Sequence, residues 1–392
     1  MIQKDQIRWF KGITDVFVDV PSHQELALNH LHPMYGTGKG LPGMNDATDV
    51  DAWAAALNVR KAMSHITDRG FIVDQISIGL AIPATTSMPR AAVGYDLTIP
   101  HRAYSIIKAK EFMTEAGLNY DTLTDSDNDG VYETSFFEIT VLSPNTKIER
   151  NEWSENYILE LPKIGIGVKE HISTGWAEIG PRTFGWKGTG GAPVPLYDDE
   201  GYDVLFVGHD WSLDYDPQEL YREPNRLGGG DGNFYNFDLD SLQTDLVSLI
   251  RDYLSELDFT LRNEKVKLVQ LELYEYLPAI PIIYPISQWG FRGGINGYDA
   301  LLLSQTSMEW DRLQNVRREL ILTNNNLTMT GSSVFSSVST VEAPEPFDTP
   351  STTSYEASFL PVLSSILILL PILVLFNRRK NRFVIPNAIM RI

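Results

Sequence analysis

The chain has 392 residues, enough for two ordinary domains, and 43% of them are hydrophobic, so it can bury sizeable cores. It contains no cysteine, which excludes disulfides, thiolate metal sites and cysteine nucleophiles. Its formal net charge is −19, and setting aside the five basic residues of segment 377–392 leaves −24 on residues 1–376, a charge that repels nucleic acid.

The first part of the chain predicts two strands and two helices. Segment 14–30 has alternating apolar residues on each side of a Pro-Ser-His turn, which predicts two short strands. Segment 49–67 is rich in alanine and has Thr48 or Asp49 as an N-cap, so we expect a helix there. Segment 101–116 is amphipathic and is followed by a glycine suited to a C-cap, which predicts a second helix.

The middle of the chain continues this alternation of strands and helices. We expect strands at 138–142, 164–171 and 202–207, and helices at 150–161, 239–257 and 262–276. Segment 277–291 contains three prolines, which lack the N–H group that a central strand uses, so it is expected to be an edge strand or a crossover. The whole pattern predicts an open α/β sheet.

The C-terminal region predicts a membrane anchor at 357–376. Segment 359–376 has eighteen residues without a charge, and a helix of that length spans about 27 Å, close to the thickness of a bilayer core. The basic run NRRKNR follows, and basic flanks stay cytoplasmic, so the body is expected outside the cell and the tail 377–392 inside. A buried core helix is the alternative, although only 16 residues follow Phe376.

A stalk is expected before this anchor. Segment 332–358 contains 15 Ser, Thr or Pro among 27 residues and no Lys or Arg, a composition that cannot bury a core. Asn326-Leu327-Thr328 matches the N-glycosylation sequon, in agreement with an outside location. The first ten residues lack the basic-then-apolar pattern of a signal peptide, so we expect the chain to be N-terminally incomplete.

Five segments, in sequence order, resemble motifs of the family 5 solute-binding proteins of ABC importers, which bind dipeptides, oligopeptides or nickel. NVRKAMSHITDR at 58–69 is similar to the VRxAxxxAIDR helix of that family, and IKAKEFMTEAG at 107–117 is similar to its KAKxLLxEAG helix. KIGIGV at 163–168 resembles a helix-to-strand join, GHDWSLDYDP at 208–217 resembles the GWxADYxDP loop, and NFYNFDLD at 233–240 resembles NYxxYxNxEVD. The proline-rich segment 278–284 resembles the return strand of the family.

The resemblance implies a two-lobed α/β fold of the type II periplasmic-binding-protein kind, with the first lobe largely missing, followed by one transmembrane helix. The implied divisions are the end of the first lobe and hinge crossing at 1–46, the second lobe at 47–285, the return segment at 286–325, the stalk at 326–356, the helix at 357–376 and the tail at 377–392.

The resemblance also implies a ligand-binding aspartate. In peptide-binding relatives the aspartate of the ADY loop pairs with the α-amino group of the ligand, and its counterpart here is Asp214, flanked by Trp211 and Tyr215. A carboxylate suits an ammonium group through charge-assisted hydrogen bonds, and neighbouring aromatic rings exclude water. An ordinary surface turn is the alternative, because Asp and Pro are favoured turn residues.

The segment DSDNDG at 125–130 has the spacing of the first half of a calcium-binding loop. Asp125, Asp127 and Asp129 alternate as ligands would, and a glycine permits the sharp turn. The twelfth position, where such a loop has a glutamate, is Phe136, and Glu133 stands at the ninth. A plain acidic turn is therefore the alternative to a weak calcium site.

The remaining polar motifs predict no chemistry. The seven histidines, among them His23 and His209, are scattered without an HExxH or triad pattern. The glycine-rich segment 228–232 lacks the lysine of a phosphate loop and is expected to be a connector. Asn236 and Asp240 are expected to hold a turn and cap a helix.

We therefore expect a membrane-anchored extracellular protein that captures solutes, plausibly peptides, for an ABC permease, without a cofactor and without catalysing a reaction. The alternative is a truncated surface receptor or relict binding module that takes no part in transport. A hydrolase that uses two carboxylates is a third reading, for which the sequence shows no paired site.

Overall fold

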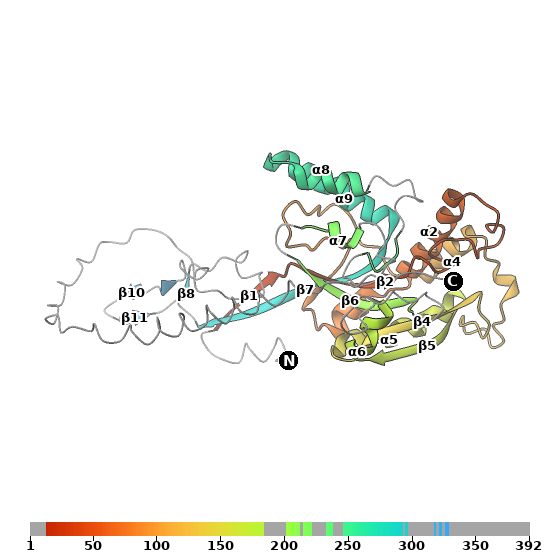
Figure 1. The fold of residues 1–392 in the computed structure, drawn as a ribbon. Coiled ribbons are helices and arrows are strands. Elements are labelled where there is room, and N and C mark those ends of the chain that lie inside the picture. Colours follow the sequence, from red (N-terminus) through yellow and green to blue (C-terminus); the bar gives the residue numbers. More distant parts are fainter. Residues whose placement is uncertain are drawn as a thin grey trace, which may run out of the picture. The chain divides into compact units, whose positions relative to one another are not determined.

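The computed structural model describes residues 13–183, 201–211, 215–221, 233–237, 246–292, 295–296, 317–318, 321–323 and 326–328. The strands of its main sheet are β1 (Ile13–Asp19), β2 (Ser22–Leu28), β3 (Ala81–Pro83), β4 (Phe137–Pro144), β5 (Ile166–Thr174), β6 (Val204–Asp210) and β7 (Ala279–Arg292). Their order is β1-β7-β2-β6-β4-β5 (Figure 1). β3 pairs with β7 beside this path. Two short pairs join β8 (Ile295–Asn296) to β9 (Arg317–Arg318) and β10 (Ile321–Thr323) to β11 (Asn326–Thr328).

The described helices are α2 (Asp49–His65), α3 (Arg69–Phe71), the π-helical turn η1 (Ile72–Ile76), α4 (Ile106–Glu115), the 3-10 turns η2 (Tyr120–Thr122) and η3 (Leu161–Ile164), α5 (Ile148–Glu160), α6 (Trp176–Thr183), α7 (Gln218–Tyr221), α8 (Leu246–Ser255) and α9 (Phe259–Tyr276). The predicted helix at 49–67 is confirmed, and Thr48 caps it by accepting a hydrogen bond from the N–H of Asp51. The second predicted helix begins five residues late, because Ser105 is its N-cap.

The predicted alternation of strands and helices is confirmed as an open α/β sheet. β4 runs parallel to both β5 and β6, and α5 connects β4 to β5. β2 runs antiparallel to both of its neighbours, β6 and β7. The partners of the first two strands therefore lie about 180 to 280 residues further along the chain, which the local pattern alone does not reveal.

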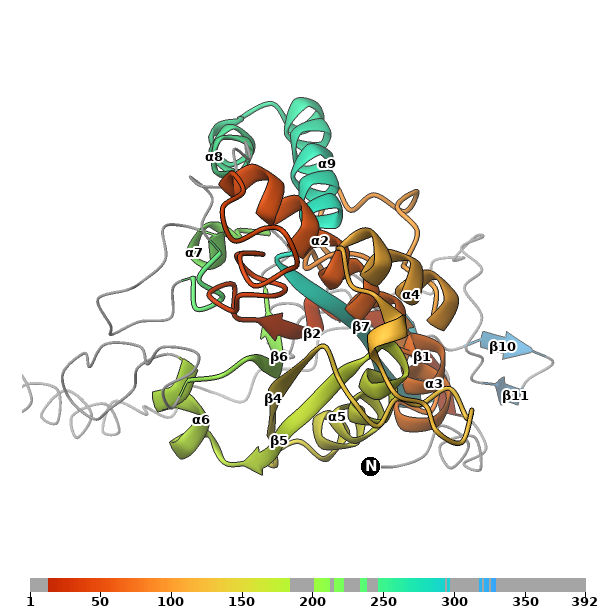
Figure 2. The same cartoon turned by 90° about the vertical axis from the view of Figure 1, so that its right-hand side faces the viewer.

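In the middle of the sheet, alternate residues of β2 and β6 enter two different cores. Leu26 and Leu28 belong to the first core, with residues of α2, α4 and α5. Ala27 belongs to the second core, with residues of α8 and α9. Figure 2 shows α2 beside α4 and α8 beside α9. Odd-numbered residues of β2 therefore face the second core.

The expectation of an edge strand at 277–291 is wrong, because β7 is an inner strand. Its residues 279–283 pair with β2, and residues 286–292 pair with β1. Pro281 has no N–H to donate, but it lies where the register of β2 and β7 shifts between Gln24 and Glu25. Its carbonyl accepts a hydrogen bond of 2.8 Å from Nε of Arg69. The irregularity and the arginine together accommodate the proline inside the sheet.

Two fully buried arginines connect α2 and its C-terminal extension to distant backbone. Arg60 donates to the carbonyl oxygens of Tyr35 at 2.7 Å and Tyr276 at 3.2 Å. Arg69 donates to Pro281 and to further carbonyl groups. Burial lowers the pKa of each guanidinium to about 9, so both remain charged at neutral pH. Each arginine thereby donates hydrogen bonds to buried carbonyl groups of distant segments.

The main sheet combines strands from both sides of the expected lobe boundary at residue 46, since β2 precedes it and β4, β5 and β6 follow it. The divisions at 46 and 285 stay predictions. Among the described residues, no helix is long and apolar enough to cross a membrane. The expected transmembrane helix at 357–376 lies outside the described residues, as do the tail and the stalk beyond Thr328.

Buried histidines predict a loss of stability in acid. Burial lowers the pKa of His30 well below its ordinary value and that of His32 to about 3, so both rings stay neutral in the folded state. The unfolded chain takes up these protons below about pH 6.5. Their contribution to stability is complete above that pH and decreases as the pH falls towards about 3, by up to about 1.4 kcal/mol per pH unit for each histidine.

We therefore expect the free energy of unfolding, measured in urea between about pH 7 and about pH 4, to fall less steeply in His32→Asn than in the unmodified protein. Asparagine keeps an acceptor for the N–H of Met34, which bonds Nδ1 of His32 at 3.2 Å. Equal slopes for the two proteins would contradict a buried, neutral His32.

Candidate functional site

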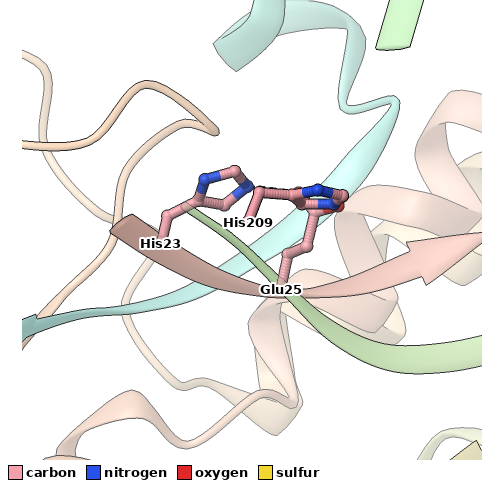
Figure 3. A group of neighbouring side chains, drawn as sticks. All are labelled: His23, Glu25 and His209. Carbon is pink, nitrogen blue, oxygen red and sulfur yellow. Dashed lines mark hydrogen bonds and ion pairs between the residues drawn. The ribbon is translucent and has the colours of Figure 1, made fainter. Parts of the chain in front are cut away.

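A polar cluster forms where β2 and β6 pair on the second-core face of the sheet. His23 lies directly opposite His209 in the antiparallel register. Glu25 is two residues further along β2 and so projects from the same face. Figure 3 shows the three side chains, which project from two neighbouring strands and meet on one side of the sheet. We call His23, Glu25 and His209 the HEH cluster.

The carboxylate of Glu25 is the centre of the HEH cluster. Nε2 of His23 lies 2.9 Å from Oε2 of Glu25, and Nε2 of His209 lies 3.2 Å from Oε1. The hydroxyl of Tyr235, from the segment 233–237, also donates to Oε1. Burial raises the pKa of Tyr235 well above its ordinary value, so this hydroxyl keeps its proton. Three donors therefore meet one carboxylate.

Trp211 determines which nitrogen of His23 carries the proton. Its indole Nε1 lies 2.9 Å from Nδ1 of His23, and an indole N–H can only donate. Nδ1 must therefore be the acceptor, and the proton of the neutral ring is on Nε2, from which it is donated to Glu25. The indole also lies nearly parallel to the imidazole of His23, with an interplanar angle of 11° and centroids 5.9 Å apart.

The electrostatics agree with this assignment. Burial alone raises the pKa of Glu25, but the charge and hydrogen bonds of His23 and His209 act against it, and the net pKa lies well below the ordinary range. Burial lowers the pKa of His23 and outweighs the opposing effect of Glu25. Glu25 is therefore an anion beside a neutral His23, stabilised by hydrogen-bond donors.

The HEH cluster is largely buried and reaches solvent beside His209. His23 and Glu25 are completely buried, whereas the side chain of His209 is 18% exposed. Trp211 is also partly exposed. The ring of Phe234 lies against His209 with centroids 6.0 Å apart. A ligand would therefore reach the cluster past His209 and Trp211.

Chemically, the HEH cluster offers two imidazoles and one carboxylate, a set that binds protons or borderline metal ions. The ligand atoms of its three residues lie within 4.8 Å of one another. No reacting pair of carboxylates is present in it, and the second anion that a glycosidase needs is absent from these three residues.

The three residues predicted to bind the ligand differ in burial and in whether the structure describes them. Trp211 is partly exposed at the end of β6, and its backbone N–H donates to the carbonyl of Pro21 at 2.6 Å. Tyr215 is fully buried, its hydroxyl lies 3.1 Å from Oγ of Ser87, and its ring packs edge-on against Trp211. Asp214 lies outside the described residues, so its role stays a prediction.

The acidic loop brings its three aspartates together. Carboxylate atoms of Asp125, Asp127 and Asp129 lie within 4.8 Å of one another. Backbone N–H groups of the loop already bind these carboxylates, as Gly130 does with Asp125 at 3.2 Å. The ring of Phe136, at the twelfth position, packs against Tyr120. The loop is therefore an ordered turn, and calcium binding by it stays a prediction.

The HEH cluster is not predicted from the sequence, in which His23 and His209 are far apart and form no known motif. A local signal exists in the pattern His-x-Glu at 23–25, which places both side chains on one face of a strand. The partner His209 becomes visible only through the pairing register of β2 and β6. Asn236 behaves as expected of a turn residue, with a φ of 53°.

Removal of the Tyr235 hydroxyl tests whether Glu25 is charged. We expect Tyr235→Phe to lower the free energy of unfolding by about 1.5–3 kcal/mol. A hydrogen bond to a charged group contributes more to stability than one between neutral groups. Tyr221→Phe is the matched control: Tyr221 stacks on Tyr235 with centroids 6.1 Å apart, and its hydroxyl meets neutral Ser87 at 2.9 Å. Tyr221→Phe should lower the free energy of unfolding, measured in urea, by about 1 kcal/mol. An equal decrease in both variants would argue against an anionic Glu25.

Solved structures show what the fold resembles. HbpA2 from Haemophilus parasuis is 18% identical, with a TM-score of 0.57, over 81% of this chain and 52% of that one. DppA from Helicobacter pylori, in complex with the peptide STSA, is 19% identical, with a TM-score of 0.52, over 80% and 50%. AppA from Bacillus subtilis, in complex with a nonapeptide, is 18% identical, with a TM-score of 0.50, over 74% and 50%.

The chain thus spans about half the length of the solved structures it matches. At these identities the likeness shows the fold, an open α/β sheet of the periplasmic-binding-protein kind. No curated protein sequence matches the chain. The family model described as bacterial extracellular solute-binding proteins, family 5 Middle, matches residues 12–233, more than half of the chain. The chain therefore belongs to the family 5 bacterial extracellular solute-binding proteins.

Proposed function

We propose that the chain captures small peptides outside the cell for an ABC importer, and that Asp214 binds the α-amino group of the peptide. Membership of a family of solute-binding proteins carries the proposal. In that family the capture of a solute is a binding step, and two lobes close on the ligand. The described residues supply one large α/β sheet of such a protein, and a second lobe and the permease belong to the proposal as well.

The residues on either side of segment 212–214 are held in place. Trp211, before the segment, is held to Pro21 by its backbone and to His23 by its indole. Tyr215, after the segment, is held in the second core by its hydroxyl and by the hydroxyl of Tyr253, which donates to its carbonyl at 2.8 Å. Trp211 and Tyr215, which flank the proposed ligand residue, are therefore anchored to the sheet and its core.

Calorimetric titration with short peptides tests the role of Asp214. We expect Asp214→Ala to weaken binding by about 10–100-fold, the usual value of a hydrogen bond to a charged group. Acetylation of the peptide amine removes the same interaction from the ligand side. The unmodified protein should therefore lose a similar factor with acetylated peptides, whereas Asp214→Ala should lose little more.

Asp216→Ala is the matched control, because Asp216 is an exposed aspartate two residues away. It should leave affinity within about threefold of the unmodified protein. If free and acetylated peptides bind equally well, the assignment of Asp214 fails. If no peptide binds, peptide capture by this chain fails, and the alternative of a relict module without transport activity is favoured.

We also propose that segment 357–376 anchors the protein in the cell membrane, with the body outside and the tail 377–392 in the cytoplasm. The support is the uncharged run of eighteen residues at 359–376 followed by basic residues. We expect the full chain to sediment with membranes and resist extraction with carbonate. A chain ending at residue 356 should appear in the soluble fraction, and equal sedimentation of both would contradict an anchor.

A further inference from the structure

The HEH cluster has a donor set that peptide capture does not use. Two imidazole nitrogens and a carboxylate converge within 4.8 Å, and two of the three residues are completely buried. Nε2 of His23 and Oε2 of Glu25 are 2.9 Å apart, and Nε2 of His209 and Oε1 are 3.2 Å apart. Ligands placed at about 2.0–2.1 Å around one tetrahedral zinc ion are about 3.3 Å apart, so small side-chain rotations suffice.

We propose that His23, Glu25 and His209 bind a divalent transition metal ion such as Zn²⁺, with the fourth position facing solvent beside His209. Imidazole and carboxylate ligands suit this class of ion, whereas calcium and magnesium prefer oxygen ligands alone. The hydroxyl of Tyr235 donates to Oε1 of Glu25 and leaves Oε2 for the metal, as an outer partner that orients a ligating carboxylate. The inference does not depend on peptide binding.

Trp211 regulates this site through the tautomer of His23. In the structure the indole N–H donates to Nδ1, so Nε2 carries the proton and has no lone pair for a metal. Metal binding at Nε2 requires that this proton move to Nδ1, with no net release from the ring. Two N–H groups would then face each other, so the indole must leave. Trp211 is partly exposed just after the end of β6, so the proposal has its indole turn towards solvent.

This competition gives the proposal a signature that a purely structural cluster lacks. Trp211→Phe removes the donor that stabilises the wrong tautomer and keeps an aromatic ring. We therefore expect the variant to bind metal about fivefold more tightly than the unmodified protein, the factor that corresponds to one ordinary hydrogen bond. A cluster that only stabilises the fold predicts no gain of this kind.

The experiment is a titration of the untagged full chain with Co²⁺, followed by its visible absorption and then by competition with Zn²⁺. We expect one ion per chain and the intense visible bands of a four- or five-coordinate site. His209→Asn should abolish the bands, and it is the safest ligand variant because the His209 side chain is 18% exposed. His101→Asn, which removes an exposed histidine elsewhere, should change nothing.

Thermal unfolding of each variant without metal verifies that it is folded. Zn²⁺ should raise the unfolding temperature of the unmodified chain and of Trp211→Phe, but not that of His209→Asn. The proposal is overturned if the unmodified chain binds no Co²⁺, if His209→Asn binds it equally well, or if Trp211→Phe binds no more tightly. Peptide binding is measured in separate titrations of the same proteins. Failure of metal binding can therefore be distinguished from failure of peptide capture.

Discussion

The pairing of β2 with β6 on one side and β7 on the other is the constraint on which the rest of the structure depends. It brings together an early segment, the middle of the chain and residues 279–283. Because side chains alternate along a strand, a slip of one residue would turn Glu25 into the first core and Leu26 out of it. The hydrophobic pattern of β2 thus fixes the register, and the register in turn assembles the HEH cluster.

The HEH cluster and the two buried arginines are buried charged groups of opposite sign. Glu25 is a buried anion, and neutral or weakly acidic donors surround it. Arg60 and Arg69 are buried cations, and backbone carbonyl groups surround them. In each case dipoles of fixed orientation replace the water that the charge has lost. Charged groups therefore determine where the loop at Tyr35, the end of α9 and β7 meet α2.

Much of the fold could be predicted from the sequence, and most of the site could not. The helix at 49–65 was readable because its cap and its apolar spacing are local. The inner position of β7 could not be predicted from its prolines, because the sheet irregularity and the Arg69 contact that accommodate Pro281 arise from distant residues. The HEH cluster includes His209 from another strand, and the local hydrophobic pattern does not show which strands pair. The family could be predicted because its motifs are short, local sequence patterns that this chain resembles.

The same long-range pairing affects how the protein is made. Nε2 of His30 meets the carbonyl of Pro278 across 248 positions of the chain, and Arg69 meets Pro281 across 212. Contacts between residues so far apart in the chain form slowly. The entropy cost of closing a long loop comes before any stabilisation by the contact. On the ribosome, the apolar edge of β2 stays without its second neighbour until residues 279–283 have been synthesised. The nascent chain therefore exposes an unpaired edge of β2 until then, and its safe folding depends on protecting that edge.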